Sequence, residues 1–175
     1  MDVAGEGFDA VIRHGTVSDT WLVAARLAPS RRMLVASPAY LAAHGAPRSL
    51  EELEAHRAVL YTNRTQDWRF LGLNGGGTGP VAVHPRSVLR VNNGIVMRDA
   101  VVAGLGISLL PSFIAQEAIC DGRLDIVDVG ERTEAADVHL IYRKEAGGSA
   151  KLRALVRHLR KAFGDPPYWE KGLPA

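Results

Sequence analysis

Residues 91–111 read VNNGIVMRDAVVAGLGISLLP, and this stretch decides the fold. It predicts the end of a strand, a helix, a glycine stop and a short buried strand. Asn92 or Asn93 can cap the helix, because an amide oxygen at that position accepts a hydrogen bond from an early backbone N–H. Gly104 stands where helices end in a left-handed residue. Gly106 then lets the next strand begin against a neighbour without a side chain in the way.

The predicted helix is almost entirely apolar. Arg98 and Asp99 are its only charged residues, so we expect most of its circumference to be buried. Its first N–H groups open at the carboxyl end of a strand, where open α/β sheets bind small ligands. The stretch therefore predicts both a core helix and one wall of a binding site.

Size and composition favour a globular protein of the cytoplasm. A chain of 175 residues has room for one domain or two small lobes, and its 47% hydrophobic and 23% charged content is ordinary. The net charge of +2 does not by itself predict nucleic-acid binding. Cys120 is the single cysteine, which excludes an internal disulfide and fits a reducing compartment. We find no secretory signal and no apolar run of membrane-spanning length, so no membrane partner is expected.

Working outward, the remaining chain alternates between strand and helix patterns, which is typical of the α/β class. The predicted strands are 8–13, 21–27, 32–37, 58–62, 68–70, 81–84, 87–91, 123–127 and 138–143. The predicted helices are 38–44, 49–54, 111–120 and 149–163. After Gly164 the sequence Asp165-Pro166-Pro167 predicts a loose tail.

Catalytic and metal chemistry are poorly supported. The six histidines are scattered without metal-ligand spacing, and no Gly-x-Ser-x-Gly elbow is present. Gly104-x-Gly106 follows a helix and lacks the third glycine of a dinucleotide-binding loop, so packing explains it better. Three carboxylates fall on one solvated helix face: Glu51, Glu52 and Glu54. We therefore expect neither an enzyme nor a metal or organic cofactor.

The helix predicted at 149–163 carries a basic stripe. Its cations are Lys151, Arg153, Arg157, His158, Arg160 and Lys161. A DNA-contacting face is one interpretation. A solvated outer face, with cations near the helix C-terminus, explains the stripe with fewer assumptions and is favoured.

Polar side chains follow several predicted strands. Asn92 and Asn93 offer amides beside helix N–H groups, which suits a carboxylate or a similar anion. Ser37 begins a second helix with the same capacity, and Thr62 and Asn63 follow another strand. Each is most often a cap or a turn when taken singly, but together they predict a small-ligand cleft.

The ordered set of motifs resembles a known family. It includes GFDAVIR at 7–13, RLAPSRR at 26–32, ASPAYL at 36–41 and WRF at 68–70, and it is completed by the opening stretch and by GRL at 122–124. To about Phe163 the chain resembles the effector-binding domain of LysR-type transcriptional regulators.

The resemblance implies a two-lobed fold like that of type 2 periplasmic binding proteins. It places 1–34 and 140–175 in a partial first lobe and 35–139 in the second lobe. A small effector, anionic or aromatic, would bind between the lobes and close them, shifting a homo-oligomer (dimer or tetramer) between conformations. The matching ligand positions are Arg13, Ser37, Thr62, Asn63, Asn92, Asn93 and Ile107.

In such regulators DNA is read by an N-terminal winged helix-turn-helix. We expect that domain, its linker helix and the first elements of lobe one to be absent from this chain. An apolar strand edge would then be exposed. Met1 is accordingly an internal start of a longer frame, or the start of a truncated product, or a partner covers the edge. Two alternatives stay open: a cytoplasmic solute-binding module, and a truncated oligomerisation fragment without DNA binding of its own.

Overall fold

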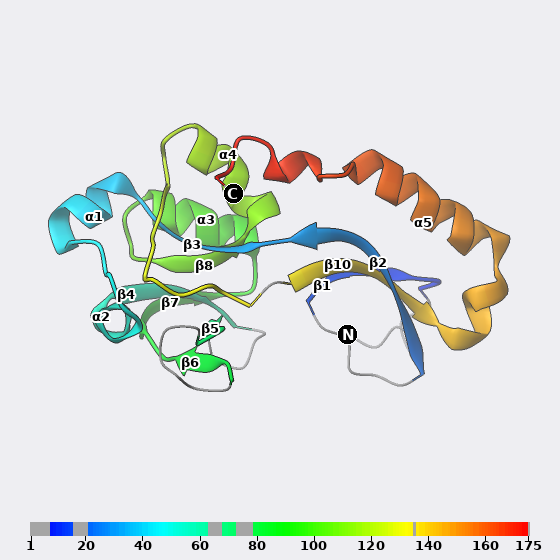
Figure 1. Cartoon of the computed structure of the whole chain (residues 1–175), viewed down its shortest axis with the longest axis horizontal. Helices are drawn as coiled ribbons and strands as arrows, with labels where there is room; N and C mark the ends of the chain where they lie inside the picture. The colour runs from blue at the N-terminus through cyan, green and yellow to red at the C-terminus, as the bar shows by residue number, and fades with distance from the viewer. Residues whose placement is uncertain (1–7, 16–20, 63–67, 73–78, 135, 175) are drawn as a thin grey trace. The chain divides into compact units, whose positions relative to one another are not determined.

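The computed structural model describes residues 8–15, 21–62, 68–72, 79–134 and 136–174 (Figure 1). The chain divides into two compact units. Unit 1 comprises Met1–Ser30 and Ala135–Lys171, and unit 2 comprises Arg31–Glu134 and Gly172–Ala175. Within the described residues, no helix combines the length and apolar character that crossing a membrane requires.

The observed divisions lie four to five residues from the expected lobe boundaries. Strand β3 (Arg32–Ala36) belongs to unit 2 from its first residue, because Arg32 is already paired with Pro111. Strand β10 (Ala136–Arg143) belongs wholly to unit 1, because Ala136 is already paired with Ser30. Strand pairing, rather than composition, sets both boundaries.

Unit 1 is built on an antiparallel sheet in the order β1-β10-β2. Helix α5 supplies its buried Leu152, which packs against buried side chains of the sheet such as Leu27 and Leu140. Val156, Leu159 and Phe163 of α5 pack against the same cluster, whereas Leu155 is exposed. Besides β10, the elements of unit 1 are β1 (Val11–His14), β2 (Leu22–Ser30), the 3₁₀ helix η1 (Lys144–Gly148), α5 (Ala150–Phe163) and the 3₁₀ helix η2 (Tyr168–Glu170).

The segment after Gly164 is not the loose tail that its prolines predict. It forms η2, whose Trp169 is buried in the core of unit 1. The Trp169 ring meets Phe163 edge to face, with ring centroids 5.0 Å apart. The indole supplies apolar area that offsets the entropy of ordering this segment.

Unit 2 contains three small sheets. Strand β3 lies between β8 and β9 and is antiparallel to both, β4 pairs with β7 in parallel, and β5 pairs with β6 in antiparallel fashion. A parallel bridge between Ala58 and Ile107 joins β4 to the start of β8. The elements besides β3 are α1 (Pro38–His44), α2 (Leu50–Ala55), β4 (Arg57–Tyr61), β5 (Trp68–Phe70), β6 (Val81–Val83), β7 (Arg86–Val91), α3 (Gly94–Val102), β8 (Ser108–Pro111), α4 (Ser112–Cys120) and β9 (Asp125–Ile126).

Two buried clusters form the core of unit 2. One surrounds Phe70 and includes Leu53 and Ile107, and the other joins α3 and α4 to β3 and β8. Gly106 permits this packing, because a Cβ there would collide with the carbonyl oxygen of Arg57 and lie 2.8 Å from its carbonyl carbon. The predicted packing role of this glycine is confirmed.

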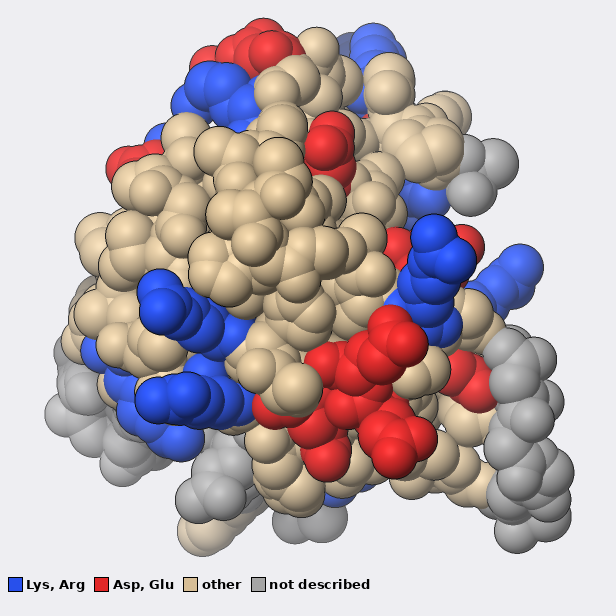
Figure 2. All heavy atoms as spheres, turned by 90° about the vertical axis from the view of Figure 1, so that its left-hand side faces the viewer, with Lys and Arg blue, Asp and Glu red and all other residues tan. Residues whose placement is uncertain are grey.

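The acidic residues of α2 are exposed, as their pattern predicts. Glu51, Glu52 and Glu54 all lie on the solvent side of the helix. Figure 2 views the side on which α1 and α2 lie and shows acidic side chains gathered below its centre. Ser49 caps α2, since its Oγ accepts the Glu52 N–H at 3.2 Å.

Candidate functional site

The parallel pair β4 and β7 brings two predicted site residues together. Tyr61 and Val91 are partners in the register, so the residues that follow each strand leave the sheet at the same edge. The Thr62 N–H extends this pairing by donating to the Val91 carbonyl at 2.9 Å. Thr62 therefore lies beside Asn92, and both side chains are exposed.

Asn93, rather than Asn92, caps helix α3. Its Oδ1 accepts the N–H groups of Ile95 at 2.9 Å and Val96 at 3.2 Å, and its carbonyl accepts that of Met97 at 3.1 Å. The cap fixes the direction of α3 and places the positive end of its dipole at the edge where Thr62 and Asn92 emerge. The first turn of α3 contains no acidic residue to neutralise that end.

The prediction that α3 is buried around most of its circumference is wrong at its first turn. Met97 and Val101 face the core, but Ile95 is 54% exposed and Val96 is 47% exposed. Two apolar side chains next to the cap are therefore exposed to solvent. Sequence reasoning missed this part of the site, because apolar residues in a helix ordinarily indicate core.

Ser37 and Ile107 do not join this group. Both lie near the opposite end of α3, where a Cβ on Gly104 would be 3.7 Å from the Ser37 Oγ. Helix α3 separates them from Asn93 by about 13 Å, at 1.5 Å per residue. Ser37 is buried, and its Oγ accepts the Tyr40 N–H at 3.2 Å.

The Ile107 side chain is fully buried in the core around Phe70. Its N–H donates to the Arg57 carbonyl, and its own carbonyl accepts the Val59 N–H, each at 2.9 Å. Both backbone groups of Ile107 are thus hydrogen-bonded to residues of β4. The structure gives Ile107 a packing role at this position.

Two predicted positions remain, Arg13 and Asn63. Arg13 belongs to unit 1, on β1, where it is exposed and is the register partner of His139. Asn63 lies outside the described residues. The described part of the chain contains no group of three or more histidine, cysteine or acidic side chains placed to hold a metal ion.

The site so assembled consists of Thr62, Asn92, the Asn93 cap and the exposed pair Ile95 and Val96. It offers a hydroxyl, an amide and a positive helix end beside an apolar surface. This combination suits a small molecule with one anionic or polar end and an apolar body.

Comparison with known proteins finds one family. The family model of the LysR substrate binding domain matches residues 1–164. The HTH-type transcriptional regulator DmlR of Escherichia coli is 32% identical over 165 residues, which are 94% of this chain and 53% of that protein. The HTH-type transcriptional regulator CrgA of Neisseria meningitidis is 29% identical over 161 residues, which are 90% of this chain and 52% of that protein. The chain thus spans about half the length of these curated relatives.

Solved structures agree with the sequence comparison. The regulatory domain of CrgA, a LysR-type transcriptional regulator from Neisseria meningitidis, superposes with a TM-score of 0.74 at 27% identity. The match covers 92% of this chain and 78% of that domain. The α/β fold predicted from the sequence is confirmed as the fold of these regulatory domains.

Proposed function

Because this chain belongs to the LysR substrate-binding domain family, we propose that it senses a small metabolite for a transcriptional regulator. Binding of the metabolite selects one of two conformations of the domain and so changes how the whole regulator acts on transcription. Such a sensor performs no chemistry on its ligand. An enzymatic role is therefore not part of the proposal, in keeping with relatives that are transcriptional regulators.

The observation that carries the proposal is the meeting of strands β4 and β7 with the capped end of α3. Thr62 and Asn92 supply polar groups there, and the helix end favours negative charge. Ile95 and Val96 supply apolar contact. We infer a ligand with a carboxylate or similar group joined to an aromatic or aliphatic body.

We keep Arg13 and Asn63 as proposed contacts on the strength of the family resemblance, and we leave out Ser37 and Ile107. DNA would be read by another part of the regulator, and homodimers or tetramers would carry the conformational change. A cytoplasmic location follows from the proposed role, because the regulator must reach DNA.

Calorimetric titration with small carboxylates tests the ligand. A panel that includes benzoate, phenylacetate and succinate samples aromatic and aliphatic bodies. We expect heat of binding from at least one of them, and Asn92→Ala to weaken that binding about tenfold, or ~1.4 kcal/mol. Absence of binding by every member to a folded sample contradicts the proposed ligand class.

Ser37→Ala is the matched control. Ser37 caps helix α1 and lies near Gly104, just beyond the C-terminal end of α3. The substitution should lower stability by about 1 kcal/mol, as the loss of a helix cap does, and leave affinity unchanged. If Ser37→Ala weakens binding as much as Asn92→Ala does, the ligand does not bind at the N-terminal end of α3 as proposed.

A further inference from the structure

Unit 1 contains a cavity of about 380 Å³ beside helix α5. Its apolar lining comes from Ala25, Leu152 and Val156. Its charged lining comes from Arg153, Arg157 and Arg160. A cavity of this volume lies within the usual range for small-molecule sites, and all of its lining residues belong to unit 1.

The three arginines share one face of α5. Their spacing of four and then three residues places their Cβ atoms next to one another on that face. Helix α5 itself contains no acidic residue. The stripe favoured from sequence as a solvated face therefore includes three cations that line a cavity. A bound anion would be attracted by their combined charge.

Arg160 is fixed in position. Its Nε and Nη2 donate to the carbonyl oxygen of Arg26 at 2.9 and 2.6 Å. The carboxylate of Asp137, on the neighbouring strand, is already engaged with the side chain of Arg26 at 2.6 and 3.2 Å. These two hydrogen bonds hold the Arg160 guanidinium in place beside the cavity. The Asp137 carboxylate pairs with Arg26. Among the described residues that line the cavity, none is acidic.

The apolar part of the lining restricts which anions suit the cavity. Leu152 is buried and Val156 is half-buried, so both offer aliphatic surface close to the guanidinium groups. The half-buried ring of Tyr142 completes this part of the cavity. An inorganic anion would leave the apolar surface in contact with water, whereas an anion with a hydrocarbon chain would cover it.

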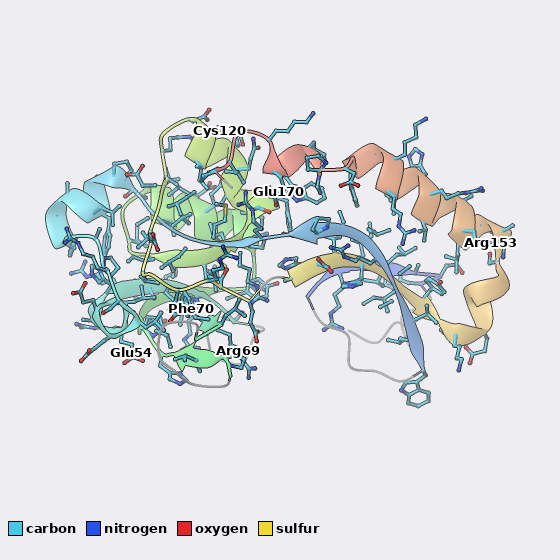
Figure 3. All side chains as sticks on the ribbon, in the orientation of Figure 1. Glu54, Arg69, Phe70, Cys120, Arg153 and Glu170 are labelled. Atoms are coloured by element: carbon cyan, nitrogen blue, oxygen red, sulfur yellow. The ribbon has the colours of Figure 1, made fainter. Side chains whose placement is uncertain are left out.

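We propose that this cavity binds an amphiphilic organic anion of the alkyl carboxylate class. The carboxylate accepts hydrogen bonds from the arginine stripe, and the alkyl chain lies along Leu152 and Val156. Figure 3 shows Arg153 at the start of α5, beside η1. This site is separate from the effector site at α3, and its existence does not depend on that site.

Octanoate is the probe, with octanamide and acetate as controls. Calorimetry should detect octanoate binding, at least tenfold weaker binding of the uncharged octanamide, and no measurable binding of acetate, which lacks the chain. Equal affinity for octanoate and octanamide overturns the role of the arginines. Absence of octanoate binding to the folded protein overturns the site.

Two variants that each remove one positive charge test whether octanoate binds at the cavity. Arg157→Gln removes a cavity cation and should weaken octanoate binding at least tenfold. Lys161→Gln lies on the same helix outside the lining and should change it less than twofold. Equal losses in the two variants would indicate a general charge effect and contradict the proposal.

Asn92→Ala separates the two sites. Octanoate also falls in the ligand class proposed for the effector site, so Arg157→Gln is repeated in the Asn92→Ala background. There it should still weaken octanoate binding at least tenfold, because Asn92 belongs to unit 2. If the loss of affinity follows Asn92→Ala and not Arg157→Gln, octanoate reports the effector site and the cavity proposal fails. The effector proposal would survive that result.

Discussion

Units 1 and 2 differ in the number of buried apolar clusters that their described residues form. Unit 2 encloses two clusters, in which large side chains such as Phe70 and Leu110 are fully buried. The described residues of unit 1 form one cluster, between its sheet and α5. Both units also expose large apolar side chains, Trp21 in unit 1 at 75% and Ile95 in unit 2 at 54%. Unit 2 therefore has the larger closed core, and the core of unit 1 depends on one helix and the segment that follows it.

One helix of each unit carries charge of a single sign. The exposed charge on α2 of unit 2 is acidic, and α2 has no basic residue. Helix α5 of unit 1 is basic and has no acidic residue, and its arginines border a cavity. We infer from this comparison that unit 2 is the more stable unit. The proposed effector site lies on unit 2, and the proposed anion cavity lies on unit 1.

Removing Phe70 should have the largest effect on stability. Its ring is fully buried at the centre of one cluster of unit 2, and Figure 3 marks its position. Phe70→Ala should lower the free energy of unfolding by about 3–5 kcal/mol, as large core truncations do. Urea unfolding measures the loss. Leu71→Ala, at the exposed next position, is the control and should cost less than about 1 kcal/mol.

The corresponding change in unit 1 is Trp169→Ala. We expect a loss of about 3 kcal/mol, at the lower end for such truncations, because η2 can detach and leave no enclosed cavity. Tyr168→Ala, at the neighbouring exposed position, should cost less. Hydrogen exchange should show faster opening of α5 and β10 in Trp169→Ala and of β4 and β5 in Phe70→Ala. If both variants accelerate exchange in the same elements, the two units do not differ as proposed.

Gly106→Ala tests how tightly unit 2 is closed. A Cβ at this position meets the backbone of Arg57, which cannot move without displacing β4. The cost should be about 1–3 kcal/mol, as for overpacking in a dense core. Gly79→Ala introduces the same methyl group where nothing lies within 4 Å. Equal stability of the two variants in thermal unfolding would contradict close packing between β4 and the start of β8.

The sequence predicted local structure well, because local patterns determine it. The strand expected at 87–91 and the helix expected at 149–163 are observed at Arg86–Val91 and Ala150–Phe163. Apolar periodicity indicated the helix, and the glycine that ends it was visible in the sequence. The strand expected at 123–127 shortens to Asp125–Ile126, because only its centre pairs with β3.

The site was harder to predict, because it depends on strand direction. Ser37 and Asn93 are both helix caps and look equivalent in sequence. Ser37, however, follows β3, which is antiparallel to β8, and the Ala58–Ile107 bridge makes the start of β8 parallel to β4. Ser37 and Thr62 therefore emerge at opposite ends of these strands. The burial of Trp169 was equally invisible, since no local pattern predicts its contact with Phe163.

The smallest effect that we predict concerns a buried tyrosine in unit 2. The Tyr40 hydroxyl accepts the Arg57 N–H and lies 3.1 Å from the His56 Nδ1. Which of the two groups donates depends on the His56 tautomer. The hydroxyl donates its own hydrogen in the neutral tautomer whose Nδ1 is unprotonated, and protonation of His56 removes that arrangement. Burial lowers the pKa of His56 below its usual 6.5, nearby His44 lowers it further, and Glu52 opposes the shift.

Unfolding should therefore become easier in acid because of His56. Below pH 6.5 the unfolded chain binds a proton that the folded chain resists, so stability falls as the pH drops from 6.5 toward the lowered pKa of the folded state. His56→Asn keeps an acceptor near the Nδ1 position and cannot titrate, so its stability should fall less over this range. Urea unfolding of both proteins between pH 7.5 and about 5 measures the difference, and the other histidines cancel in the comparison. Parallel curves would mean that His56 is not held neutral by the fold, and that the closed core of unit 2 does not extend to Tyr40.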